Sequence, residues 1–369
     1  MNKATRILHV LGNLDRGGAE TFIMNIYRHI ERSRIQFDFM VHTMDKWAYD
    51  DEILSLGGQI YRVPPYRIVN HVQYESEWSK FLKNNNSYKM IHGHMTSTAS
   101  VYLKLAKRKG ITTASHSHNT SSGQGVSAII KDMLQVPLKS MADYLFACSM
   151  AAGKWCYGKD FHERTNFHMI QNAIDTEKFI YNPFVRNLKR EELGIESKFI
   201  IGHIGRFNAQ KNHSFLIDIF KNIYDQNRNA ILLLVGDGVL RKNIEKKVEK
   251  LGLKDNVIFT GVRSDIPELL CAMDVFLLPS LYEGLPVTLV EAQANGLRCI
   301  ISDVITQEAK VTNLLEYLPL QESASYWARK ILEFEKGYER ENMQKVMANA
   351  GFDIKNVAKW LEDFYCEVS

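Results

Sequence analysis

The chain has 369 residues, of which 45% are hydrophobic and 24% are charged. This composition is typical of a soluble globular protein and excludes a disordered one, and the length predicts two domains rather than one core. The formal net charge is only +4, from 46 Lys and Arg against 42 Asp and Glu, and no nucleic-acid partner is expected.

Neither export nor a membrane span is expected. The first apolar run covers only residues 7–11 and is interrupted by His9, which is too short for a signal peptide. No stretch contains eighteen consecutive apolar residues, so no transmembrane helix is predicted. The five cysteines are scattered and form no C-x-x-C, which argues against a disulfide framework or a zinc site and favours a cytoplasmic protein.

The charges are unevenly distributed along the chain. Residues 1–180 hold 22 Lys and Arg against 16 Asp and Glu, whereas the remainder holds 24 against 26. Ten of the twelve histidines also lie in the first half. Two interpretations stay open: ordinary variation in surface composition, or a first domain that faces an anionic partner such as a phosphorylated acceptor or a membrane.

Short apolar segments alternate with segments of helical spacing along the whole chain. In residues 19–30, for example, Phe22, Ile23 and Ile26 share one helical face. Strands that alternate with helices predict parallel sheets and therefore two Rossmann-like α/β/α units. The expected strands are 5–12, 36–43, 59–64, 90–94, 111–117 and 144–149, then 198–206, 230–238, 256–262, 275–280 and 298–303.

The predicted domains are residues 1–180 and 181–350, because the periodicity lapses in residues 172–197. Residues 351–369 are expected to form a helix that packs back towards the first domain. Ligands of open α/β sheets bind beyond the carboxyl ends of the strands. Two such units facing each other would place the site in the cleft between them.

Three motifs follow predicted strands. In GNLDRGGAETFIMN (12–25), Gly17 and Gly18 precede a helix, which suits either a tight turn or a phosphate cradle at the helix N-terminus. In GRFNAQKN (205–212), Arg206 and Lys211 are either two surface charges or a pair that neutralises a diphosphate.

The third motif, SLYEGLPVTLVEAQANG (280–296), places Glu283 before a helix and Glu291 inside it. Pro286 suits the first helical turn, and the first backbone N–H groups form an anion site. Carboxylates accept hydrogen bonds from two neighbouring hydroxyls, so the motif could hold a sugar, a phosphate and a ribose in line. The alternative is that both acids only complement the helix dipole, which explains Glu283 better than Glu291.

These motifs together resemble the retaining GT-B glycosyltransferases of the large fourth family, which carry an E-x7-E motif. Further segments match in order over nearly the whole chain. The closest resemblance is to bacterial capsular and exopolysaccharide transferases. The matching segments are GGAE (17–20), HGH (92–94), SHSHN (115–119), MIQNAIDTEKF (169–179), GRFNAQKN (205–212), LLLVGDG (232–238) and residues 259–296.

The resemblance implies roles for individual residues. Glu283 would hold hydroxyls of the transferred sugar, and Glu291 would hold the ribose. His118 would be the active-site histidine near the donor sugar, with His116 as the less favoured register. The catalytic set is therefore His118, Glu283, Arg206 and Lys211.

The same resemblance implies a nucleotide-sugar site. Arg206 and Lys211 would bind the leaving diphosphate, Gly17 and Gly18 would line the cleft opposite the phosphates, and Arg263 would contact the base. The donor-binding set is Gly17, Gly18, Arg206, Lys211, Arg263, Glu283, Gly284, Leu285, Pro286, Val287 and Glu291.

The expected reaction moves a hexose or N-acetylhexosamine from a nucleotide diphosphate sugar, UDP-linked as in most relatives, to a lipid-linked capsular or exopolysaccharide repeat unit. Retention of the anomeric configuration follows from the resemblance alone. The sequence contains no D-x-D, so neither a divalent metal nor another cofactor is expected. We expect the cations of the protein to stabilise the leaving group.

One amphipathic segment of the first domain bears on the acceptor. Residues 121–140 place Val126, Ile129 and Met133 on one helical face, which either packs on the core or touches lipid. The second interpretation predicts peripheral contact with the anionic inner face of the cell membrane.

Two rival functions stay open: a GT-B sugar-nucleotide epimerase or hydrolase, and a non-catalytic nucleotide-sugar binding protein. A dinucleotide dehydrogenase is excluded, because neither half carries G-x-G-x-x-G with an acid about twenty residues further on.

Overall fold

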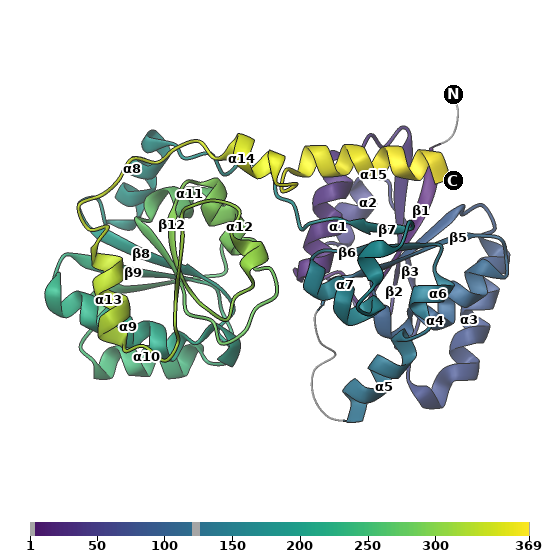
Figure 1. Ribbon diagram of the computed structural model, residues 1–369, viewed down its shortest axis with the longest axis horizontal. Helices are drawn as coiled ribbons and strands as arrows, with labels where there is room; N and C mark the ends of the chain where they lie inside the picture. Colours follow the sequence, from purple (N-terminus) through teal and green to yellow (C-terminus); the bar gives the residue numbers. More distant parts are fainter. Residues whose placement is uncertain (1–3, 120–125, 369) are drawn as a thin grey trace. The chain divides into compact units, whose positions relative to one another are not determined.

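The computed structural model describes residues 4–119 and 126–368 and forms two compact units (Figure 1). The first unit comprises Met1–Ala173 and Asp353–Ser369, and the second comprises Ile174–Phe352. Each is built on one sheet in which every described strand pair is parallel. The predicted pair of parallel α/β units is thus confirmed.

The first sheet has the strand order β3-β2-β1-β4-β5-β6-β7. Its strands are β1 (Thr5–Leu11), β2 (Ile35–Val41), β3 (Ile60–Arg62), β4 (Met90–Gly93), β5 (Thr112–Ser117), β6 (Tyr144–Ala147) and β7 (Phe167–Met169). The helices are α1 (Gly18–His29), α2 (Asp50–Ser55), α3 (His71–Asn84), α4 (Thr96–Lys107), α5 (Val126–Gln135), α6 (Leu138–Met141), α7 (Met150–Tyr157) and α15 (Ile354–Val368).

The second sheet has the strand order β10-β9-β8-β11-β12-β13. Its strands are β8 (Phe199–Ile204), β9 (Ala230–Val235), β10 (Val257–Gly261), β11 (Val275–Leu278), β12 (Arg298–Ser302) and β13 (Leu315–Leu318). The helices are α8 (Pro183–Leu193), α9 (His213–Gln226), α10 (Arg241–Lys250), α11 (Ile266–Ala272), α12 (Val287–Ala294), α13 (Ala324–Leu332) and α14 (Gln344–Asn349).

All eleven predicted strands are present, but two strands were not predicted. These are β7 and β13, with three and four residues, at the edges of the two sheets. Edge strands bury less apolar surface, and β13 even includes a glutamate, Glu316. Their sequences therefore lack the continuous apolar run that marks a central parallel strand.

Residues 174–180, which the sequence assigned to the first domain, belong to the second unit. Ile174 and Phe179 pack in a core cluster with residues of β8, β9 and α12. The backbone N–H of Ile174 also donates to the carbonyl of Phe352, 3.0 Å away. Both crossings between the units therefore lie at the same place, after Ala173 and before Asp353.

Helix α15 completes the core of the first unit. Its buried residues include Ile354, Ala358, Leu361 and Tyr365, which share a cluster with α1 and β2. The carboxylate of Glu362 accepts a hydrogen bond from the backbone N–H of Glu31 at 3.0 Å. The last helix of the chain is therefore part of the first unit, beside α1 (Figure 1).

Helices cover both faces of each sheet because successive strand residues point in opposite directions. In β1, Ile7 and Leu11 join the cluster that includes α1 and α15, whereas Leu8 and Val10 join the cluster of α3 and α4. His9 lies between them in the alternation and is fully buried on the face of α1 and α15.

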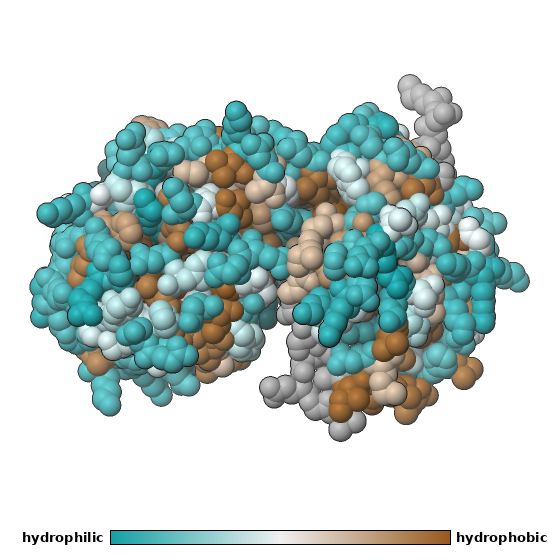
Figure 2. Space-filling view, viewed as in Figure 1, coloured by the Kyte–Doolittle hydropathy of each residue, from teal (hydrophilic) through white to brown (hydrophobic). Residues whose placement is uncertain are grey.

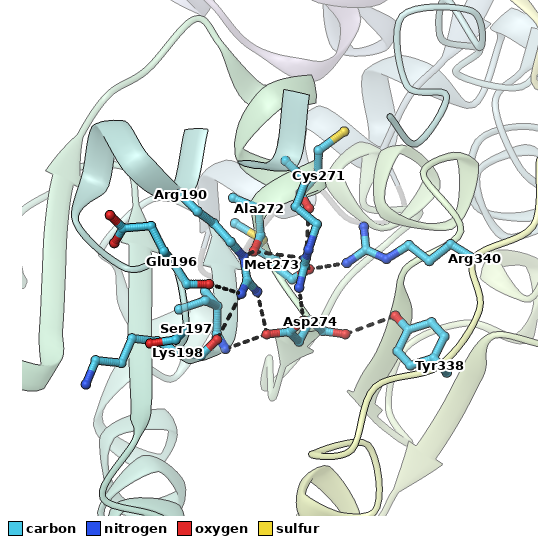
Figure 3. A network of polar contacts seen from close by, with 12 residues as sticks. Arg190, Glu196, Ser197, Lys198, Cys271, Ala272, Met273, Asp274, Tyr338 and Arg340 are labelled. Carbon is cyan, nitrogen blue, oxygen red and sulfur yellow. Dashed lines mark hydrogen bonds and ion pairs between the residues drawn. The ribbon is translucent and has the colours of Figure 1, made fainter. Parts of the chain in front are cut away.

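A polar network at the start of β11 anchors that strand (Figure 3). The carboxylate of Asp274 accepts hydrogen bonds from Arg190 at 2.6 Å and from the backbone N–H of Ile200 at 2.8 Å. Arg190 also donates to the carbonyl of Ala272, and Arg340 donates to that of Met273, so the arginines satisfy carbonyls at the end of α11. The tyrosine hydroxyl of Tyr338 donates to the Asp274 carbonyl at 2.9 Å.

Two sequence expectations concern membranes and cysteines. Over the described residues, every helix is too short or too polar to cross a bilayer. All five cysteines are free thiols, and only Cys366 is exposed.

Candidate functional site

The carboxyl edge of the second sheet gathers most of the predicted donor site. Arg206, Gly236, Arg263 and Glu283 follow β8, β9, β10 and β11, four neighbouring strands. Since the strands are parallel, their carboxyl ends meet at one edge. The sequence motifs after these strands are therefore neighbours in the fold of this unit.

Lys211 and Glu283 form a buried ion pair at this edge. Lys211 Nζ donates to Glu283 Oε1 at 2.6 Å, and the side chains are only 14% and 7% exposed. Gln210 Nε2 donates to the other carboxylate oxygen of Glu283 at 3.1 Å. The structure thus joins two residues that the sequence assigned to different groups of the substrate, and adds Gln210, which the sequence did not single out.

Backbone contacts hold the two loops of this ion pair together. Asn208 caps a short 3-10 helix (Ala209–Lys211) by accepting from the backbone N–H of Lys211. The backbone N–H of Leu281 donates to the carbonyl of Gln210 at 2.8 Å, and Asn212 Nδ2 donates to the carbonyl of Pro279 at 3.1 Å. The loops after β8 and β11 therefore form one unit.

Arg206 is exposed and lies two residues after the end of β8. No hydrogen bond or ion pair ties its guanidinium to another residue in the described part of the chain. Gly236 lies close beside it: a Cβ on Gly236, whose φ is +132°, would lie 2.2 Å from the carbonyl oxygen of Gly205. The loop after β9 thus packs against the backbone that carries Arg206, and leaves the guanidinium available to a ligand.

Helix α12 begins one residue later than expected. Pro286 is its N-cap, and Val287 is the first helical residue, so the backbone N–H groups of Val287 and Thr288 lead the helix. Gly284 is exposed and Leu285 is half-buried. Glu291 is partly buried in α12, and its desolvation raises the pKa of its carboxyl from 4.5 to about 8. The carboxyl of Glu291 is therefore harder to ionise than that of an exposed glutamate.

Arg263 follows β10 and is bound by carboxylates of its own unit. It donates to Asp265 at 2.6 Å and to Glu192 at 3.3 Å. The hydrogen bond to Asp265 raises the pKa of Arg263, and Arg263 in turn lowers the pKa of Asp265. Its planar fork is therefore held in place by these two carboxylates.

The first unit contains a separate cavity of about 390 Å³ at the carboxyl ends of its strands. His118, directly after β5, lines it, as does Gly18 at the start of α1. Gly17 is the N-cap of α1 and offers no capping side chain, while the Glu20 carboxylate accepts a hydrogen bond from its own backbone N–H in the first turn. His116 lies inside β5, fully buried, with its ring stacked on His118 at 4.0 Å.

Other residues of this cavity were not singled out from the sequence. They include Glu20, His94, Asn119, Lys131 and Asn172. Four of them lie in motifs that the sequence did mark, since Glu20 ends GGAE, His94 ends HGH, Asn119 ends SHSHN and Asn172 lies in MIQNAIDTEKF. Burial raises the pKa of the Glu20 carboxyl and lowers the pKa of His118 to about 3. His118 is therefore neutral at physiological pH.

Comparison with known proteins identifies the family. Residues 16–178 match the family described as Glycosyltransferase Family 4, and residues 185–352 match Glycosyl transferases group 1. A protein of Bacillus subtilis (strain 168), "Putative glycosyltransferase EpsF", is 38% identical over 360 residues, which are 95% of this chain and 93% of that protein. The chain belongs to this glycosyltransferase family.

Other relatives of the transferase are more distant. "Capsular polysaccharide biosynthesis glycosyltransferase CapH" of Staphylococcus aureus is 24% identical and covers 98% of both chains. Among solved structures, "Anabaena Alr3699/HepE in complex with UDP and glucose" has a TM-score of 0.76 at 18% identity, covering 98% of this chain and 99% of that one. The predicted GT-B fold class of the transferase is thereby confirmed.

Proposed function

We propose that this glycosyltransferase moves a hexose or N-acetylhexosamine from a UDP-sugar to a lipid-linked capsular or exopolysaccharide repeat unit, with retention of configuration and without a divalent metal. The observation that carries the proposal is the arrangement of Arg206, Lys211 and Glu283 at one edge of the second sheet. It brings two cations and a sugar-binding carboxylate together where a diphosphate sugar would bind.

The names of relatives support the choice of substrates. An Escherichia coli relative, "UDP-Gal:alpha-D-GlcNAc-diphosphoundecaprenol alpha-1,3-galactosyltransferase", is 28% identical over 63% of this chain and 62% of that protein. Its name states a UDP-linked donor and a lipid-linked acceptor. Together with the capsular relative, it favours the same substrate classes for this chain.

The proposed chemistry begins with an exchange of partners. A diphosphate that enters beside Arg206 competes with Glu283 for Lys211. Once Lys211 binds phosphate, the Glu283 carboxylate is free to accept hydrogen bonds from sugar hydroxyls. As the glycosidic bond breaks, negative charge grows on the leaving phosphate. The two cations therefore stabilise the transition state more than they stabilise the bound substrate.

Retention is proposed to occur by front-face substitution, in which the leaving phosphate accepts the proton of the acceptor hydroxyl. His118 is neutral because burial lowers its pKa to about 3, so we give it a hydrogen-bonding role rather than that of a proton donor. Trapping a covalent glycosyl-enzyme intermediate would rule this mechanism out. Metal independence rests on the two protein cations and on the absence of D-x-D from the sequence.

Peripheral membrane contact through α5 is part of the proposal. Ile129, Met133 and Val136 are exposed, Met133 by 69%, and Figure 2 shows hydrophobic side chains gathered where Figure 1 places α5. The exposed Lys131 lies between Ile129 and Met133 in the sequence, and the exposed Lys139 follows Val136. Residues 121–125 of this segment lie outside the described residues. Flotation with vesicles containing acidic lipid should carry the wild type upward, and Met133→Glu should lose this binding.

One experiment tests the proposed reaction. The protein is incubated with a panel of UDP-sugars and an undecaprenyl-diphosphate-linked saccharide, with EDTA or Mg²⁺, and the products are separated and their anomers assigned by NMR. Transfer to the acceptor with the donor's configuration, undiminished by EDTA, is expected. Free or epimerised sugar without acceptor would instead identify a hydrolase or epimerase, and binding without turnover would identify a sensor.

A further inference from the structure

Gln210 is bonded to three consecutive residues of the loop after β11. The backbone N–H of Leu281 donates to the carbonyl of Gln210 at 2.8 Å. The side-chain nitrogen Nε2 of Gln210 donates to the carbonyl of Tyr282 at 3.0 Å and to Oε2 of Glu283 at 3.1 Å. By its contacts, Gln210 therefore belongs to the loop that carries Glu283, although 73 positions separate the two residues.

The partners of the Gln210 amide fix its orientation. A backbone carbonyl and a carboxylate oxygen only accept hydrogen bonds, so the group that faces both must be the NH2. The two N–H bonds of this group match the two acceptors, and neither is left over for a ligand. Gln210 is thus a donor to Glu283 rather than a side chain that binds substrate.

The two oxygens of the Glu283 carboxylate have different partners. Oε1 accepts from Lys211 Nζ at 2.6 Å, and Oε2 accepts from Gln210. The proposed diphosphate would take Lys211 away from Oε1, because opposite charges attract. The Gln210 amide carries no net charge and is also held by the carbonyl of Tyr282, so the diphosphate has much less to gain from it.

The backbone of this segment can stay in place while Lys211 changes its partner. The backbone N–H of Lys211 donates to the side chain of Asn208 at 3.2 Å, and Asn212 Nδ2 donates to the carbonyl of Pro279 at 3.1 Å. Neither contact involves the Lys211 ammonium. Only the end of the lysine side chain therefore has to move.

We infer that Gln210 is a positioning residue, which keeps Glu283 in place when Lys211 leaves it and so directs Oε1 towards the sugar hydroxyls. The inference deepens the proposed function and rests on it, because the diphosphate is the proposed cause of the exchange. Without Gln210, a carboxylate whose side chain is only 7% exposed would lose both partners as the sugar binds. A buried charge without partners is costly, so the carboxylate would turn away towards water or the departing lysine.

A purely structural tie between the two loops is the competing interpretation. The bonds from Leu281 to Gln210 and from Asn212 to Pro279 already join the loops, and neither depends on the Gln210 side chain. A structural role of the side chain would act on the fold as a whole, whereas a positioning role acts through the Glu283 carboxylate.

NMR of the full chain labelled with ¹⁵N-glutamine tests the inference without turnover. The two side-chain N–H signals of Gln210 are assigned with Gln210→Leu, and the one that faces Glu283 is assigned with Glu283→Leu. Both should exchange with water more slowly than those of the exposed Gln226.

This slow exchange should persist in Lys211→Met, which removes the ammonium without any ligand. It should also persist in the wild type with UDP or inorganic pyrophosphate. Fast exchange of the N–H that faces Glu283 in Lys211→Met would overturn the inference, whether or not either ligand binds.

Transfer kinetics separate the two interpretations. Gln210→Leu should lower kcat/KM for the donor about tenfold, the equivalent of one hydrogen bond to a charged group, without changing KM for the acceptor. In the residual transfer of Glu283→Gln, the same change should cost less than about twofold, because the effects of residues in contact are not additive. Equal losses in both backgrounds would show a structural role and overturn the inference.

Gln226→Leu is the matched control. Gln226 is exposed on α9, and its Nε2 donates to the carbonyl of Asn222 at 3.0 Å, a contact within one helix. This variant should leave transfer unchanged. If the proposed function alone is wrong, transfer is absent in the wild type as well, while the slow exchange of the Gln210 amide in Lys211→Met still stands.

Discussion

Lys211 Nζ lies 2.6 Å from Glu283 Oε1, in a pair of which both members are largely buried. The two residues are separated by 72 positions and come from the loops after β8 and β11. In the unliganded protein each charge is neutralised by the other. The proposed diphosphate and sugar must therefore replace an existing interaction. Mutation of either residue is thus expected to change both stability and transfer.

Removing Lys211 should destabilise the protein more than removing both partners. Lys211→Met leaves a buried carboxylate without its cation, and we expect a loss of about 3 kcal/mol in the free energy of unfolding. The double variant Lys211→Met/Glu283→Gln should recover most of it. Urea unfolding measures both, and transfer should be lost in each.

The exposed pair of Lys221 and Asp225 on α9 is the control for this prediction. Its side chains are 32% and 45% exposed, so Lys221→Met should change stability by less than about 1 kcal/mol. A loss as small as this in Lys211→Met would contradict the idea of a buried, coupled pair.

Glu291→Gln should stabilise the protein at the expense of nucleotide binding. Burial raises the pKa of Glu291 from 4.5 to about 8, so the wild type loses stability as the pH rises between these values, while the amide does not. The variant should therefore melt above the wild type, by a margin that grows from pH 5 to pH 8. Thermal melting at several pH values measures this.

The same variant should bind UDP about tenfold more weakly, because an amide replaces a carboxylate acceptor for the ribose. Glu339→Gln, at an exposed position of the same unit, should change neither property. A melting difference that is constant over this pH range would show that Glu291 is ionised in the folded protein.

Arg206→Gln should impair catalysis without affecting the fold. Its guanidinium is exposed and has no partner in the described residues, so stability should change by less than about 0.5 kcal/mol. The loss of a cation at the leaving phosphate should lower kcat/KM about 100-fold. Arg228→Gln, also exposed and in the same unit, is the control for the change of charge. Equal activity in the two variants would exclude Arg206 from the donor site.

Gly236→Ala should disturb both the fold and the donor site, because its Cβ would lie 2.2 Å from the backbone oxygen of Gly205, next to Arg206. Gly252→Ala is a reference for the cost of a positive φ alone, since Gly252 has a φ of +69° and open space around it, whereas the φ of Gly236 is +132°. We expect Gly252→Ala to cost about 1 kcal/mol and Gly236→Ala clearly more. Only Gly236→Ala should weaken the thermal shift produced by UDP. Matching effects would mean that the contact with Gly205 is unimportant.

The sequence by itself determined the fold class, eleven of the thirteen described strands and the loops that carry the predicted donor motifs. These follow from local patterns, since apolar runs mark buried parallel strands and glycines and charges after them mark the carboxyl edge. It could not place residues 174–180 in the second unit. No local sequence pattern shows that Ile174 and Phe179 pack against residues of β8, β9 and α12, which lie far away in the sequence. The short edge strands β7 and β13 were not predicted, because their sequences lack a continuous apolar run.

Only the tertiary structure decided which side chains meet. The pairing of Lys211 with Glu283 and the hydrogen bonds of Gln210 to Tyr282 and Glu283 join residues far apart in sequence, through loops whose contacts no local pattern encodes. The raised pKa of Glu291 and the neutral His118 likewise depend on burial, which is a property of the packed unit. Residue types fix the chemistry that is available, whereas packing fixes the partners and the protonation states.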